Sequence, residues 1–136
     1  MKVLTIKEPF ATLISVGIKK TETRSFKTNY RGDLYIHTSL KKQEYDYKNA
    51  DFKKLASKYN YEKLGYIICK CKLTDCIKMT PSYIEDMKTN HYEDYISGTY
   101  EVGRYGWVLE DVEIIKPIKA KGKLGIWNFY KNQEKN

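Results

Sequence analysis

Gly17-Ile18-Lys19-Lys20-Thr21-Glu22-Thr23-Arg24 is the stretch around which the rest of the sequence is organised, and Tyr30-Arg31-Gly32 follows it closely. A helical pattern precedes this stretch, and strand patterns follow it. Backbone turns at such a junction leave hydrogen-bonding groups free, so charged side chains there are well placed to build a binding pocket. A solvated turn in a lysine-rich protein is the alternative interpretation.

The composition favours a single basic domain. The 136 residues suffice for one domain, residues 1–136, with its own hydrophobic core. The 25 Lys and Arg residues outnumber the 17 Asp and Glu residues and give a net charge of +8. This excess favours an anionic partner, with nucleic acid first and an acidic ligand or a membrane surface second. Compositional drift toward lysine would give the same charge without a role in binding.

Arginine is rare in this chain, because lysine supplies almost all of the positive charge. The three arginines are Arg24, Arg31 and Arg104, and each lies in a short motif-like stretch. A guanidinium presents a rigid planar fork to carboxylates, phosphates or base edges, which an ammonium cannot imitate. The sparing use of arginine predicts that the planar guanidinium is needed for binding or structure at these three positions.

The three cysteines, Cys69, Cys71 and Cys76, are an odd number in a chain that shows no convincing signal peptide. Cys69 and Cys71 alternate along a predicted strand, and neither a CxxC pair nor a nearby histidine completes a zinc site. No apolar stretch approaches transmembrane length. We expect a reduced, cytoplasmic protein that has no metal site, cofactor or membrane partner.

Apolar periodicity predicts an α+β domain in which strands dominate. Strands are expected at 3–6, 20–24, 34–37, 67–79 and 105–115, with a closing segment at 125–129. Helices are expected at 9–17, 42–59 and 81–87, the last capped by Thr80. Residues 90–103 show no period and are predicted to form a long loop. The polar tail from about residue 132 is expected to fray.

Several finer features follow from the strand patterns. Asp75 interrupts the apolar side of its strand and marks a bulge or a buried carboxylate, and the bulge is favoured. A change of phase near Glu110-Asp111 predicts a second bulge, and Pro117 is expected to end that strand. Trp107 and Trp127 are expected to pack inward.

Alternation also predicts which charged side chains share a face. On a regular strand from residue 20, Lys20, Glu22 and Arg24 point one way, and Lys19 points the other way with Thr21 and Thr23. A row of self-neutralising ion pairs is the structural alternative to a binding face. His37 is expected to tie a strand to a loop.

Three stretches form a recognisable combination: Leu4-Thr5-Ile6-Lys7-Glu8-Pro9-Phe10-Ala11, the G-x-K-x-x-E-x-R motif of Gly17 to Arg24, and Arg31-Gly32 leading to Ile36-His37-Thr38-Ser39. Gly106-Trp107-Val108-Leu109-Glu110-Asp111-Val112 and Gly122-Lys123-Leu124-Gly125-Ile126-Trp127 extend it. Together they resemble the ASCH domain family (activating signal cointegrator homology) of the PUA-like superfamily. The resemblance implies a small β-barrel with helices packed outside, and a cleft between the first helix and the facing strands.

The resemblance also implies binding of RNA or other nucleic acid. A related bacterial branch hydrolyses the amide of acylated cytidine nucleosides, and its motif has Lys at the Lys19 position but Thr where this chain has Glu22. A carboxylate beside Lys19 is expected to hold the ammonium charged, which opposes general-base catalysis.

We therefore predict a nucleic-acid-binding module, with RNA as the first partner, that holds a base or nucleotide in a basic cleft. The expected binding residues are Lys19, Lys20, Glu22, Arg24, Tyr30, Arg31 and Tyr105, with the tyrosines as stacking candidates. The alternative is a hydrolase of a modified nucleoside such as N4-acetylcytidine, with Lys19 and Glu22 as catalytic residues. A third hypothesis is a protein-interaction adaptor that uses residues 90–103. An open basic groove beside Lys19 would favour binding, and a narrow pocket that encloses Lys19 with a second carboxylate would favour the enzyme.

Overall fold

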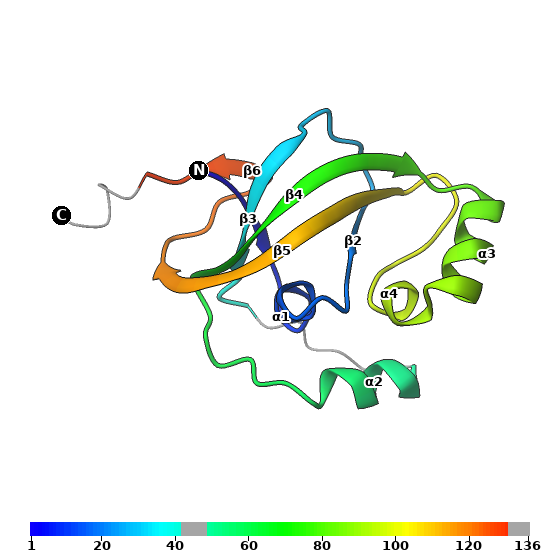
Figure 1. Ribbon diagram of the computed structural model, residues 1–136, viewed down its shortest axis with the longest axis horizontal. Coiled ribbons are helices and arrows are strands. Elements are labelled where there is room, and N and C mark those ends of the chain that lie inside the picture. Colours follow the sequence, from blue (N-terminus) through cyan, green and yellow to red (C-terminus); the bar gives the residue numbers. More distant parts are fainter. Residues whose placement is uncertain (42–48, 131–136) are drawn as a thin grey trace.

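The computed structural model describes residues 1–41 and 49–130, which form one curved sheet with helices around it (Figure 1). The strands are β1 (Lys2–Ile6), β2 (Thr21–Arg24), β3 (Gly32–Thr38), β4 (Tyr66–Lys78), β5 (Tyr105–Lys119) and β6 (Ile126–Asn128). The helices are α1 (Phe10–Ser15), α2 (Ala50–Ala56), α3 (Pro81–Asn90) and α4 (Tyr92–Ile96). The predicted α+β class and the curled, barrel-like sheet are confirmed.

The strand order is β2-β5-β4-β3-β1-β6. β1 and β3 pair in parallel, and every other neighbouring pair is antiparallel. Figure 1 shows the two long strands, β4 and β5, sweeping across the molecule side by side, with α1 below them and α3 and α4 beyond one end. β1 and β2 lie far apart in the strand order, and the chain passes between them through α1.

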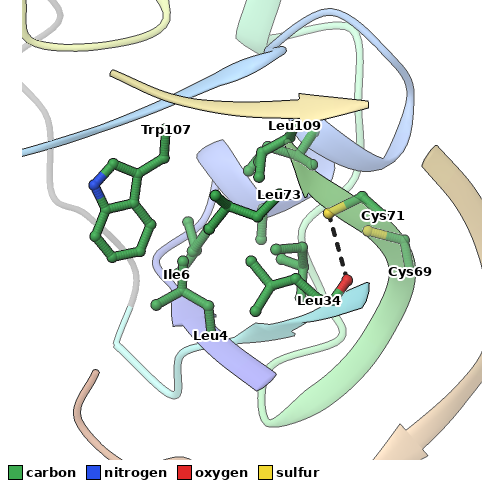
Figure 2. Close-up of a cluster of buried hydrophobic side chains, with 11 residues drawn as sticks. Leu4, Ile6, Leu34, Cys69, Cys71, Leu73, Trp107 and Leu109 are labelled. Atoms are coloured by element: carbon green, nitrogen blue, oxygen red, sulfur yellow. Dashed lines mark hydrogen bonds between the residues drawn. The ribbon is translucent and has the colours of Figure 1, made fainter. Parts of the chain in front are cut away.

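The main core lies between the sheet and α1. Its buried members are Leu4, Ile6, Ala11, Ile14, Leu34, Ile36, Cys69, Cys71, Leu73, Trp107 and Leu109. Figure 2 shows side chains from β1, β3, β4 and β5 meeting in this cluster, with the Cys71 thiol donating to the carbonyl of Leu34 at 3.4 Å. Burial raises the pKa of Cys69 and of Cys71 to about 12, so both remain neutral thiols that pack as small apolar groups.

A second buried cluster closes the other end of the fold. It comprises Val3, Ile67, Ala120, Trp127 and Phe129. Trp127 is 7 % exposed and Trp107 is 1 % exposed, so the prediction that both tryptophans pack inward is confirmed.

A chain of hydrogen bonds fixes the loop between β5 and β6 against β1 and β3. The indole N–H of Trp127 donates to Thr5 Oγ1 at 3.0 Å, and His37 Nε2 lies 2.7 Å from the carbonyl oxygen of Ala120. That carbonyl can only accept, so Nε2 carries the proton of a neutral ring, and the Thr5 hydroxyl donates to Nδ1 at 3.1 Å. His37 therefore ties strand to loop, as expected.

Both predicted bulges are present. The β4–β5 register shifts between Leu73 and Asp75, and the Asp75 side chain is exposed. Asp111 has a positive φ of 52°, opposite the register shift between Lys70 and Lys72. Each bulge adds a residue to one strand and so shifts the alternation of its side chains between the two faces of the sheet. After the second bulge Val112 packs against the main core, whereas Ile114 is 67 % exposed.

Three predicted boundaries were wrong. Residues 90–103 are not a continuous loop, because α3 continues to Asn90 and α4 follows; five residues of α4 are too few to show a period in the sequence. Pro117 does not end β5, because it falls in a register shift opposite β4 where no ladder N–H is required. Asn49 caps α2, so that helix is shorter than 42–59; residues 42–48, like the predicted tail from 132, lie outside the described residues.

We expect Trp127→Ala to lower the free energy of unfolding by about 3–5 kcal/mol, because it leaves a cavity in the second cluster and removes the bond to Thr5. Urea unfolding measures the change. Leu124→Ala is the control, since Leu124 is 99 % exposed and its loss should change stability by less than about 0.5 kcal/mol. A loss below about 1 kcal/mol for Trp127→Ala would contradict the packing described here.

His37 should make the fold sensitive to acid. Burial lowers the pKa of His37 in the folded protein below the usual 6.5. At a pH between the folded-state pKa and the unfolded-state pKa, the unfolded chain therefore binds a proton that the folded chain does not. Stability should therefore fall as the pH drops below about 6.5, and above that pH the titration of His37 should not change it further. We expect His37→Gln to be less stable at neutral pH but to lose less on acidification to pH 5, whereas the exposed His91→Gln should follow the parent. Equal acid slopes for His37→Gln and the parent would refute this.

Candidate functional site

A pocket of about 370 Å³ opens where the end of β1, the start of α1, β2 and the segment after α4 meet. Ligand pockets in proteins are typically about 300–1,000 Å³, so this one suits a single small group. The residues that line it are Thr5, Ile6, Lys7, Phe10, Lys19, Glu22, Thr23, Arg24, Ser97, Gly98, Thr99 and Arg104. Apart from Ile6, Phe10 and Gly98, all carry polar or charged side chains.

The turn after α1 directs Lys19 inward. Gly17 adopts a φ of +83°, and the backbone N–H groups of Ile18 and Lys19 both donate to the carbonyl of Leu13 at 3.0 Å. This reverses the chain, as glycine at a helix end commonly does. As a result the Lys19 side chain is only 1 % exposed.

The Lys19 ammonium has several partners inside the protein. Its Nζ donates to the carbonyl of Ser97 at 2.7 Å, lies 3.6 Å from Oε1 of Glu22, and sits 5.5 Å from the centre of the Phe10 ring. Burial lowers the pKa of Lys19, and the negative charges of Glu22 and Asp94 oppose this shift without cancelling it. Glu22 thus acts in the predicted direction, but burial has the larger effect.

Glu22 bridges two cations. Its Oε1 faces Lys19, and its Oε2 accepts hydrogen bonds from Nε and Nη2 of Arg24 at 3.0 and 2.9 Å. The Arg24 guanidinium in turn lies 5.6 Å from the centre of the buried Trp107 ring. Pairing of β2 with β5 sets this arrangement, because Glu22 lies opposite Trp107 in the register.

The charged lining is predominantly positive. The lining contains four cationic side chains, those of Lys7, Lys19, Arg24 and Arg104, and one carboxylate, that of Glu22. Arg104 donates from Nε to the carbonyl of Thr99 at 3.1 Å and from Nη2 to that of Thr23 at 3.4 Å. These contacts fix the guanidinium without neutralising it, and no ion pair to Arg104 occurs within residues 1–41 and 49–130. The pocket is therefore suited to an anionic ligand.

Asp94 holds the wall of the pocket in place, and sequence reasoning missed it. This buried carboxylate accepts from the backbone N–H groups of Lys20 and Thr21 at 2.9 and 3.1 Å and from the Thr21 hydroxyl at 2.8 Å. It thereby fastens α4 to the start of β2. Asp94 lies in a stretch whose apolar residues show no period, so nothing in the sequence indicated that this carboxylate would be buried against β2.

Gly98 lets that wall approach β2 closely. A Cβ at this position would lie 2.9 Å from Cγ2 of Thr23, a distance that real Cβ atoms do not tolerate. Nearby, the backbone N–H of Thr99 donates to the Thr23 hydroxyl at 3.0 Å. The segment that supplies Ser97 and Thr99 to the pocket therefore depends on glycine at 98.

The structure brings three of the predicted site residues together. Lys19, Glu22 and Arg24 all line the pocket. Lys20 does not, because β2 begins at Thr21 and the two lysines belong to the turn before it. The predicted strand alternation therefore fails for the lysines: Lys19 points into the pocket and Lys20 is exposed.

The other three predicted residues lie outside the lining. The Tyr30 hydroxyl donates to the carbonyl of Asp33, and Arg31 donates to the carbonyls of Thr28 and Tyr30. Tyr105 packs against the main core. Arg104, which the sequence marked only as one of three arginines, lines the pocket with Arg24, so two of the three guanidinium groups meet there.

Two site types find no support among the described residues. No cluster of three or more His, Cys, Asp or Glu side chains in them could hold a metal ion. None of the described helices combines the length and apolar character needed to cross a membrane.

Comparisons with known proteins identify the fold. The chain is similar to the crystal structure of ASCH from Zymomonas mobilis, with a TM-score of 0.60 and 12% identity over 98% of this chain and 90% of that chain. A mutant of that Zymomonas mobilis protein gives a TM-score of 0.57 and 14% identity, covering 98% of this chain and 93% of that chain. A comparison with curated protein sequences found no match. The ASCH domain model matches residues 4–121, so the chain belongs to the ASCH domain family and has its α+β PUA-like fold.

Proposed function

We propose that this ASCH domain binds RNA and holds one nucleotide in the pocket beside Lys19. The observation that carries the proposal is the lining itself, which combines four cationic side chains with one carboxylate around a space of about 370 Å³. Phosphates supply most of the affinity of proteins for nucleic acids, and unpaired RNA bases can be drawn out of the strand into a protein pocket. The net charge of +8 agrees with such a partner.

The lining suggests how a nucleotide is oriented. Nη1 of Arg104 takes part in neither of the two hydrogen bonds that this guanidinium donates to carbonyl groups, and Lys7 is exposed. Both side chains are therefore suited to binding a phosphate. Glu22 and Lys19, which are more buried, place a hydrogen-bond acceptor beside a hydrogen-bond donor. That pair complements a base with an exocyclic amine, which cytosine, adenine and guanine have and uracil lacks. We therefore expect weaker binding of uracil than of cytosine at this position.

A binding assay with variants of the two pocket arginines tests the proposal. We expect Arg104→Gln to weaken binding of a short single-stranded RNA and to reduce the slope of log K against log salt by about 0.7 for one lost phosphate contact. Arg24→Lys should also weaken binding, because the charge stays while the planar fork is lost. Fluorescence anisotropy at several salt concentrations measures both effects.

The exposed Lys58→Gln is the control, since Lys58 is absent from the pocket lining and its loss should change affinity little. Full RNA affinity in both Arg24→Lys and Arg104→Gln would contradict a role for this pocket. So would a wild-type protein that binds no RNA.

Hydrolysis of a modified nucleoside is the second candidate, because one observation favours it. Lys19 is enclosed, burial lowers its pKa, and a carboxylate stands beside it. A lysine with a lowered pKa can serve as a base or nucleophile. Two features oppose this role: Glu22 partly restores the charge of Lys19 and would repel an oxyanion formed nearby.

We expect wild-type protein to release little or no cytidine from N4-acetylcytidine, and Glu22→Thr to release more, because the repelling carboxylate is gone. Chromatography of the reaction products measures the release, with Lys19→Ala as the control. Any activity that depends on neutral Lys19 should rise with pH toward a pKa below 10.5. Rapid turnover by wild type that disappears in Lys19→Ala would make the enzyme the better description.

A further inference from the structure

Phe26 is a large apolar side chain that the fold leaves 51 % exposed, two residues beyond the end of β2. Single exposed apolar residues are common and need no explanation by themselves. Phe26 differs because both its backbone and its ring are fixed by one buried side chain. Its carbonyl accepts from the indole N–H of Trp107 at 3.2 Å, and its ring meets the Trp107 ring edge to face at 5.8 Å and 79°.

We propose that Phe26 is a stacking platform for the base that flanks the nucleotide held in the pocket. This inference rests on the proposed function, and it extends the site from one nucleotide to a step of two. An exposed aromatic face that is already immobilised loses little conformational freedom when a base stacks on it. Stacking of this kind accepts any base, because every base has a π face.

The position of Phe26 relative to the pocket supports the proposal. The Trp107 ring lies 5.6 Å from the Arg24 guanidinium and 5.8 Å from the Phe26 ring. Because both distances are measured to the same ring, the Arg24 guanidinium and the Phe26 ring are at most about 11.4 Å apart. A nucleotide bound against Arg24 therefore has its neighbour within reach of Phe26.

Local charge favours a nucleic acid over a protein as the occupant of Phe26. Residues 25–32 contain Lys27 and Arg31 and no acidic residue; Arg31 lies 3.8 Å from the Asp75 carboxylate, so Lys27 is the cation that bears on the argument. Lys27 is exposed and directly follows Phe26, where it is suited to the phosphate between the two bases. An aromatic ring beside lysine is the combination by which proteins bind single strands.

Affinities for a mononucleotide and a dinucleotide separate this inference from the proposed function. Cytidine monophosphate fills the pocket alone, and the RNA dinucleotide CpC adds the flanking base. We expect wild type to bind CpC about tenfold more tightly than the mononucleotide. Phe26→Ala should abolish that gain and leave mononucleotide affinity unchanged, Phe26→Trp should keep the gain, and Phe26→Leu should lose most of it. Isothermal titration calorimetry gives both affinities.

Tyr130→Ala is the matched control, because Tyr130 is a comparably exposed aromatic residue, at 56 %, and does not line the pocket. The inference is overturned if Phe26→Ala keeps the dinucleotide gain, or if it weakens both ligands equally, which would mean that it acts through Trp107 and Arg24. Mononucleotide binding without any gain for CpC would refute the stacking platform alone. Failure of wild type to bind either ligand would refute the proposed function as well.

Discussion

The burial of one ammonium group, that of Lys19, is the constraint on which the candidate site depends. Moving a charge out of water costs several kcal/mol unless the protein supplies partners. Here the partners come from three separate segments: the Phe10 ring at the start of α1, the Glu22 carboxylate on β2, and the Ser97 carbonyl after α4. Lys19 therefore connects the three segments that surround the pocket, because each of them supplies one partner of its ammonium group.

Positive and negative side chains alternate around Lys19 and connect it to further segments of the chain. Glu22 lies between Lys19 and Arg24. Asp94 accepts three hydrogen bonds from Lys20 and Thr21 and also acts to raise the pKa of Lys19. Since a buried carboxylate is stable only when its oxygens are satisfied, Asp94 holds α4 against β2. Arg104 stands apart from this set, because backbone carbonyls fix it and leave its charge uncompensated by the described residues. That uncompensated charge is what suits the pocket to an anion.

The fold and part of the site could be predicted from the sequence because they depend on residues that lie close together in the chain. The spacing of Lys19, Glu22 and Arg24 marked the pocket, and broken alternation at Asp75 and Glu110-Asp111 marked the bulges. The rest depends on contacts between distant segments. Ser97 and Gly98, which line the pocket, and Asp94, which holds its wall, come from a stretch without a period. Arg104 contacts Thr23 across 81 positions of sequence. Strand alternation also misplaced Lys19 and Lys20, because the turn after Gly17 delays the start of β2.

The pKa of Lys19 in the folded protein measures most directly whether this ammonium group is buried. NMR titration of protein labelled at the lysine side chains can follow its ammonium separately, with Lys19→Ala used to assign the signal. We predict a pKa below the usual 10.5, because burial outweighs the neighbouring carboxylates, and a further fall in Glu22→Gln, because one of those carboxylates is then gone. A Lys19 pKa at or above 10.5 in the parent protein would contradict this prediction and would place this ammonium in contact with water.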